Sequence, residues 1–189
     1  MVQFSAMQLG IFVLIMALLV GVIAWAVLRI ARMVPPALTK PGYASGVGGL
    51  LLIVVLFFWL QAVVPLFRLG REGAEVARVA FMEAGYFWAA FQTLIPDLVA
   101  AVTLTAAALM LTIGRSARSL TWVLLLAWVG APVVAFLRAW LLNIPLTLFG
   151  EPTAMLTGMI VTTLYLLFAD RSVLTYGLPR AATLPDRQH

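Results

Sequence analysis

Long apolar segments alternate with short polar ones along this chain. Five segments hold almost no ionisable residues, and each matches the roughly 20 residues that a helix needs to cross the hydrocarbon core of a bilayer. They are residues 9–28, 46–67, 94–113, 120–142 and 152–169. Nearly all Arg, Lys, Asp and Glu residues fall at the ends of these segments. The pattern predicts an all-α, polytopic integral membrane helical bundle with about five transmembrane helices.

Residues 71–92 have a different pattern. Arg71, Glu75 and Arg78 recur at near-helical spacing, with apolar residues on the opposite side. Aromatic residues crowd the end of this segment, which is typical of the membrane–water interface. We therefore expect one amphipathic helix lying on the membrane surface, with a solvated loop helix as the alternative.

The predicted spans leave little of the chain for a second domain. We expect residues 1–177 to form a single transmembrane domain of the 189-residue chain. The first apolar segment exceeds the roughly 7–15 residues of a signal-peptide core and lacks a basic start, so we interpret it as a retained span. The polar residues 178–189 predict a disordered cytoplasmic tail.

The composition supports a membrane protein and argues against several kinds of site. Hydrophobic residues make up 64% of the chain and charged residues 10%, against about 45–50% and about 25% in soluble domains. The net charge of +5 comes from basic residues scattered singly at the span ends, so we expect no nucleic-acid partner. The chain has no Cys and a single His, His189, so we expect no metal or haem cofactor.

The distribution of Lys and Arg predicts the orientation in the membrane. With the N-terminus outside, eight basic residues lie on the inner side and four on the outer side. An excess of Lys and Arg marks the cytoplasmic side. We therefore expect a multi-pass protein of the bacterial inner (cytoplasmic) membrane, with its N-terminus outside and its C-terminus in the cytoplasm.

Three short motifs are spread along the chain. They are Gly48-Gly49-Leu50-Leu51, Val64-Pro65-Leu66 and Ala169-Asp170-Arg171-Ser172-Val173-Leu174-Thr175-Tyr176. They resemble the span start, the Pro-Leu motif and the ending of an uncharacterised bacterial membrane family catalogued as domain of unknown function 2569. That family typically has Trp where Leu50 stands. The resemblance covers about residues 42–177, leaves the first span as an N-terminal addition, and implies a topology but no activity.

Two ionisable residues, Asp97 and Arg138, lie inside the apolar segments. The alternating direction of the spans places both near the outer interface, at the level of Gln61 and Glu151. A charged side chain deep in a span costs about 2.5–3.5 kcal/mol on insertion scales, so it usually faces a partner. We predict a polar cluster in which Arg138 pairs with Asp97 or, as the alternative, with Glu151. We favour a purely structural role, either as an ion pair or with Arg138 reaching the interface and Asp97 capping its helix. The alternative is a binding cavity open to the outside and lined by Gln61, Asp97 and Arg138.

Two classes of function remain. The first is an accessory or assembly protein that binds another membrane protein, or a second copy, through small-residue faces such as Ala17 and Gly21 or through the surface helix over residues 71–92. The second is a binder or transporter of a small anionic or lipidic molecule that uses the outer cluster. Transport ranks lower because we find no internal repeat and no charge near the bilayer midplane. No nucleophile–base pair or metal-ligand set is visible, so we do not expect an enzyme; membrane lipids are the expected surroundings.

Overall fold

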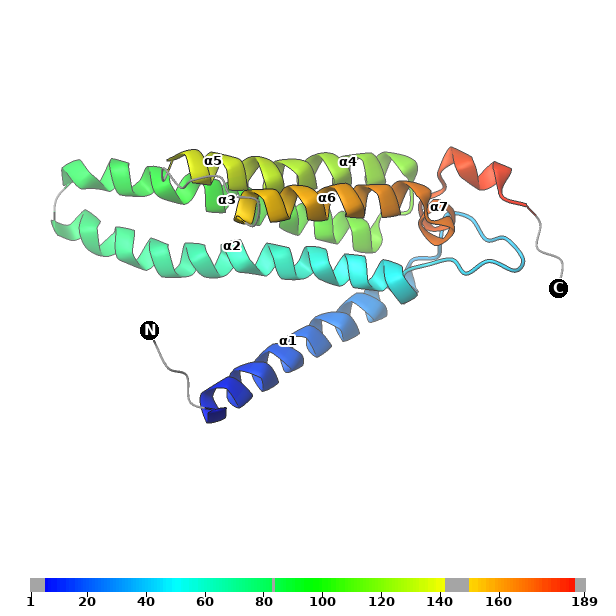
Figure 1. Cartoon of the computed structure of the whole chain (residues 1–189), viewed down its shortest axis with the longest axis horizontal. Coiled ribbons are helices and arrows are strands. Elements are labelled where there is room, and N and C mark those ends of the chain that lie inside the picture. The colour runs from blue at the N-terminus through cyan, green and yellow to red at the C-terminus, as the bar shows by residue number, and fades with distance from the viewer. Residues whose placement is uncertain (1–5, 83, 142–149, 186–189) are drawn as a thin grey trace.

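The chain folds into an elongated bundle of helices (Figure 1). The computed structural model describes residues 6–82, 84–141 and 150–185, and every regular element in them is helical, which confirms the all-α prediction. The elements are α1 (Ala6–Met33), α2 (Gly49–Met82), α3 (Ala84–Ile113), α4 (Ala117–Trp128), the π-helix η1 (Val129–Val133), α5 (Val134–Leu141), α6 (Glu151–Phe168), α7 (Asp170–Tyr176) and the 3-10 helix η2 (Pro179–Thr183).

Several of these helices have the length and composition of membrane spans. Three helices qualify among the described residues: Gly49–Arg78, Phe91–Ile113 and Ala117–Leu141. A fourth span is possible if Pro152–Phe168 and Asp170–Tyr176, which are bent by 69° at their junction, count as one. The predicted first span falls in α1, where many side chains lie outside the described part, so the count of five is not confirmed.

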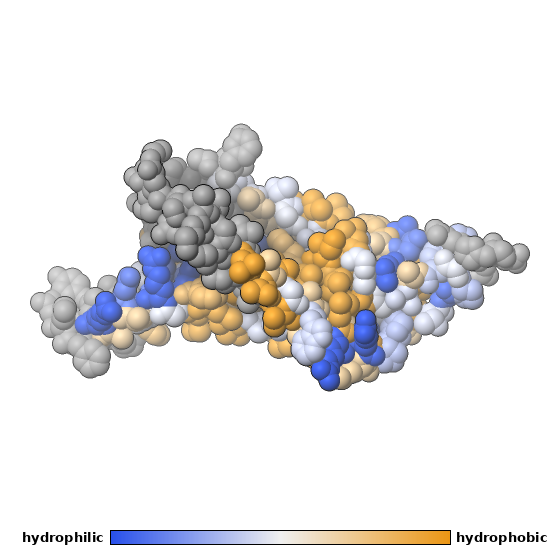
Figure 2. All heavy atoms as spheres, turned by 90° about the horizontal axis from the view of Figure 1, so that it is seen from below, coloured by the Kyte–Doolittle hydropathy of each residue, from blue (hydrophilic) through white to orange (hydrophobic). Residues whose placement is uncertain are grey.

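The surface of the molecule fits a membrane environment. Figure 2 shows hydrophobic residues gathered in the middle of one face, with hydrophilic residues toward both ends. Large exposed hydrophobic side chains occur on α2, α3, α4 and α6, for example Ile53, Val102, Trp122 and Val161. Hydrocarbon can cover such side chains at no cost, whereas water cannot. These apolar helices indicate a membrane-embedded protein.

The predicted surface helix over residues 71–92 is wrong as a separate element. Residues 71–82 continue α2 without a break, and residues 84–92 form the first turns of α3. The charged stretch therefore extends two spans beyond their apolar parts. One reason is an ion pair from the extension of α2 to α5, between Glu72 and Arg138, with 3.6 Å between Oε1 and Nη2.

The core of the bundle is built around α3. Its alanines Ala100, Ala101, Ala107 and Ala108 are all buried. Small side chains let neighbouring helix backbones approach closely. These alanines place α3 at the centre of the bundle, with α2 packed along much of its length (Figure 1).

A π-helix interrupts the fourth predicted span where the sequence places Pro132. Proline has no N–H to donate and its ring clashes with the preceding turn of an α-helix, so a wider turn relieves the conflict. Gly130 in the same segment lies directly against α3. A Cβ at Gly130 would stand 2.2 Å from Thr103 Oγ1 and 2.9 Å from Leu104 Cγ, so only glycine fits there.

At one end of the bundle, α7, η2 and the segment that follows α1 together form a compact cap. Ala37 N donates to Thr175 O at 3.1 Å, and Leu38 N donates to Leu174 O at 3.0 Å. Arg171 Nε donates to Gly46 O at 3.1 Å. These bonds tie residues near the start of the chain to residues near its end.

The prediction of a disordered tail over residues 178–189 is wrong for its first part. Residues 179–183 form η2, and Ala181 and Leu184 are buried in a small second core with Val173 and Leu174. The apolar residues of the tail therefore stabilise a fixed position. Residues 186–189 lie outside the described part of the chain.

Candidate functional site

Asp97 is the most buried charged residue among those described, with 3% of its surface exposed. It lies with Pro96 well inside α3, which begins at Ala84. Asp97 therefore does not cap the N-terminus of its helix, and the capping role considered for it is wrong. The expected first-turn position failed because the helix starts about three turns earlier than its apolar part does.

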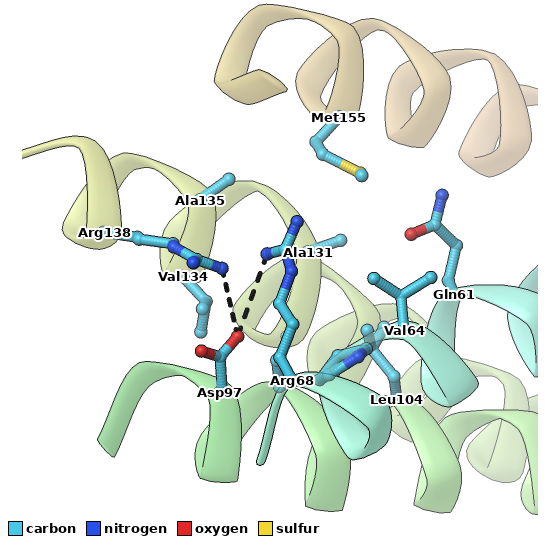
Figure 3. A pocket seen from close by; sticks show the side chains of 13 residues that line it. Gln61, Val64, Arg68, Asp97, Leu104, Ala131, Val134, Ala135, Arg138 and Met155 are labelled. Atoms are coloured by element: carbon cyan, nitrogen blue, oxygen red, sulfur yellow. Dashed lines mark hydrogen bonds and ion pairs between the residues drawn. The ribbon is translucent and has the colours of Figure 1, made fainter. Parts of the chain in front are cut away.

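Two arginines from other helices converge on this carboxylate (Figure 3). Arg138 of α5 donates from Nη1 to Asp97 Oδ1 at 3.3 Å. Arg68 of α2 places Nη1 3.8 Å from the same oxygen. The predicted pair between Arg138 and Asp97 is thus present, and it joins α3 to α5. The side chain of the alternative partner, Glu151, lies outside the described part.

Glu72 completes a network of four charges. Its Oε1 lies 3.6 Å from Nη2 of Arg138, so that one arginine bridges two carboxylates. With Arg68, the contacts of this network join two positive and two negative side chains. We call these four residues, Arg68, Glu72, Asp97 and Arg138, the polar cluster.

Arg68 and Glu72 were missed from the sequence because we ended the second span at Arg68 and began a separate helix at Arg71. The signal was nonetheless present. Residues four apart lie on the same face of a helix, so Arg68 and Glu72 become neighbours as soon as the helix continues. Only the continuity of α2 through this region makes that spacing meaningful.

A cavity of about 40 Å³ lies beside the polar cluster. Gln61, Asp97 and Arg138, three of the predicted site residues, all line it, together with apolar groups such as Leu104 and Met155 (Figure 3). A space of at least about 10–15 Å³ admits a water molecule when polar partners are present. The cavity is therefore large enough for water or for a small part of a ligand, but not for a whole drug-sized molecule.

The chemistry of this site is that of charge pairing and hydrogen bonding. The described residues contain no group of three or more His, Cys, Asp or Glu side chains placed to hold a metal ion. The guanidinium groups supply N–H donors, and Gln61 supplies an amide. These N–H donors and this amide can form hydrogen bonds with a polar headgroup.

No family model, no curated protein and no solved structure matches the chain. Two of the three short motifs, the one that begins at Gly48 and the one that contains Arg171, meet in space at the cap. A Cβ at Gly48 or Gly49 would stand 2.9 Å or 2.7 Å from the guanidinium nitrogens of Arg171. Both glycines therefore make room for the arginine of the ending motif.

Proposed function

We propose that this protein is a non-enzymatic accessory or assembly subunit of the bacterial inner membrane, and that it binds a transmembrane helix of another membrane protein through α1. One observation carries the proposal: α1 leaves the bundle obliquely (Figure 1). Its buried positions, Val27 and Ala31, lie near its C-terminal end. The earlier part of the helix points away from the other spans.

The exposed side of α1 has the composition of a helix contact. Leu14, Leu18, Val22 and Trp25 are each exposed by 62% or 63% and lie on one side of the helix. Ala17 lies among them with Gly21, which has no atom within 4 Å of the position of a Cβ. A small-xxx-small pair of this kind lets a second helix approach closely.

The family resemblance and the orientation belong to the same proposal. The contact between Arg171 and the Gly48-Gly49 pair supports the idea that these two resembling motifs form one structural unit, to which α1 is added.

Transport of a small anion is less favoured, because the polar cluster pairs each arginine with a carboxylate. The excess of basic residues on the side of the cap supports a cytoplasmic C-terminus.

Photo-crosslinking in native membranes tests the proposal. A photoreactive residue is placed at Val22 on the exposed face of α1, and another at Val161 on the exposed face of α6. We expect one discrete protein adduct from position 22 and none from position 161. Gly21→Leu should abolish the adduct, whereas Ala154→Leu on the exposed side of α6 should leave it unchanged.

The glycine variant separates binding from folding. Because nothing lies within 4 Å of a Cβ at Gly21, Gly21→Leu is expected to leave the thermal unfolding of the purified chain unchanged. An adduct with a second copy of the chain would replace the accessory role by self-association. Crosslinking to lipid alone, or an adduct that persists in Gly21→Leu, would refute the proposal.

A further inference from the structure

A hollow of about 310 Å³ lies on the last turns of α1, at the end of the helix that leads into the cap (Figure 1). Trp25, Leu28, Arg29 and Arg32 line it, and we call it the Arg29–Arg32 hollow. Trp25 and both arginines are exposed, so the hollow opens to the surroundings of α1 and not to the core. Pockets for small molecules measure about 300–1,000 Å³, so this one can take a lipid headgroup while the acyl chains stay in the bilayer.

The two arginines of the hollow are unpaired. Neither Arg29 nor Arg32 forms a hydrogen bond or an ion pair in the part of the chain that the structure describes. Cζ of Arg29 lies 5.3 Å from the centre of the Trp25 ring. A cation–π contact of this kind orients the guanidinium group without using its N–H donors. The hollow therefore presents two like charges, one helical turn apart, that an anion between them would stabilise.

Other basic residues at this end of the bundle already have structural roles. Arg115, Arg171 and Arg180 each donate a hydrogen bond to a backbone carbonyl oxygen, at 2.9 Å, 3.1 Å and 3.2 Å. These bonds hold the turn before α4 and the cap in place. The two arginines of the hollow have no such role. Arg118 is exposed at the start of α4 and does not line the hollow, so it offers a matched control.

We propose that the Arg29–Arg32 hollow binds the headgroup of an anionic phospholipid of the phosphatidylglycerol type, in the leaflet on the side of the cap. Its phosphate accepts hydrogen bonds from both guanidinium groups. Residues three apart on a helix are neighbours, with Cβ atoms about 5–6 Å apart, and the guanidinium group matches the geometry of a phosphate. The carbon atoms next to the phosphate lie on Leu28 and Trp25, because Trp side chains sit at the level of the headgroups.

The charge of the hollow selects the headgroup. The described residues that line it include two positive side chains and no negative one. The ammonium group of phosphatidylethanolamine would therefore meet only like charges there, whereas phosphatidylglycerol brings a single negative charge. Basic residues clustered at the end of a transmembrane helix attract anionic lipids in the same way.

This lipid site is separate from the helix contact proposed for α1. Ala17 and Gly21 line a different hollow, which shares only Trp25 with this one. A headgroup at the two arginines thus leaves the small-residue pair free for a partner helix.

Native mass spectrometry of the full chain tests the lipid site. The delipidated protein is incubated in mild detergent with equal amounts of dioleoyl phosphatidylglycerol and dioleoyl phosphatidylethanolamine. We expect phosphatidylglycerol to be retained at least fivefold more than phosphatidylethanolamine. Arg32→Gln should lower the retention of phosphatidylglycerol at least threefold, and the double variant with Arg29→Gln should remove the preference. Arg118→Gln removes the same charge from another exposed arginine at this end and should behave like wild type.

A competition experiment separates a lipid headgroup from a free anion. Excess glycerol phosphate should leave the retention of phosphatidylglycerol unchanged, because the acyl chains keep the lipid beside α1. Displacement by glycerol phosphate would overturn the lipid assignment in favour of a soluble anion.

The wild-type preference and the competition require no variant, and circular dichroism checks that the variants fold, as the exposure of both arginines leads us to expect. Equal retention of both lipids by the wild type would refute the proposal, as would equal losses in folded Arg32→Gln and Arg118→Gln. Neither result would bear on the crosslink expected at Val22, which does not line this hollow.

Discussion

Asp97 links three helices through a single carboxylate. One of its oxygens lies near Arg138 of α5 and Arg68 of α2, and the carboxylate itself belongs to α3. The arginines are each partly exposed, while Asp97 is almost completely buried. Removing Asp97 therefore costs more folding free energy than removing one arginine. Without the acid, two cations lie near each other and lack their shared partner.

Asp97→Ala is expected to lower the free energy of unfolding by about 2–4 kcal/mol, below the upper end for a fully buried pair because both arginines reach the surface. Leu98→Ala, at an adjacent and exposed position, should cost little. Thermal unfolding in detergent, followed by circular dichroism, measures both. The double variant Asp97→Leu with Arg138→Met should recover part of the loss. Equal melting temperatures for Asp97→Ala and Leu98→Ala would contradict a stabilising role for the cluster.

At the scale of elements, the three prolines inside the long helices behave differently. Pro132 coincides with the π-helix η1, whereas α2 and α3 contain Pro65 and Pro96 without leaving the α-helical assignment. At η1, Gly130 brings the backbone against Thr103 of α3, so that the turn is fixed by a tertiary contact.

Gly130→Ala tests this contact. The added methyl group would collide with Thr103 and Leu104, so we expect a loss of about 1–3 kcal/mol in the free energy of unfolding, the usual cost of overpacking. Gly158→Ala on α6 is the matched control, because its Cβ would meet only Phe57, at an ordinary 4.0 Å. Chemical denaturation in detergent compares the two variants. A destabilisation that is no larger for Gly130→Ala than for the control would argue against close packing at η1.

For the whole molecule, the two ends of the bundle differ in their organisation. One end carries the polar cluster, where long extensions of α2 and α3 project beyond the apolar region (Figure 1). The other end carries the cap, which joins the segment after α1 to α7 and η2. The basic residues near the cap outnumber those near the cluster, which favours a cytoplasmic cap.

Cysteine labelling tests this orientation directly, because the chain contains no Cys of its own. A membrane-impermeant maleimide added to intact cells is expected to label Ala77→Cys on the extension of α2 but not Thr183→Cys in the cap. In inverted vesicles the labelling should reverse. The opposite pattern would show that the positive charge of the cap does not set the orientation.

The sequence by itself determined the helical class, the main apolar spans and the pair between Asp97 and Arg138. These follow from local rules: hydrophobic runs of bilayer length, and the high cost of a charge within a span. Helix ends were predicted poorly, because the apolar part of a span says nothing about how far the helix continues into polar surroundings. The surface helix over residues 71–92 failed for that reason. The first part of the predicted disordered tail failed for another reason, because Ala181 and Leu184 pack into the small second core.

Only the tertiary structure decided which distant residues meet. Arg68 and Glu72 joined the cluster because α2 continues past the apolar region and lies beside α3 and near α5. Arg171 reached Gly48 and Gly49 because the bend after α6 returns the chain to the start of α2. Periodicity and composition are properties of neighbouring residues, whereas contacts between segments more than a hundred residues apart depend on how the whole bundle packs.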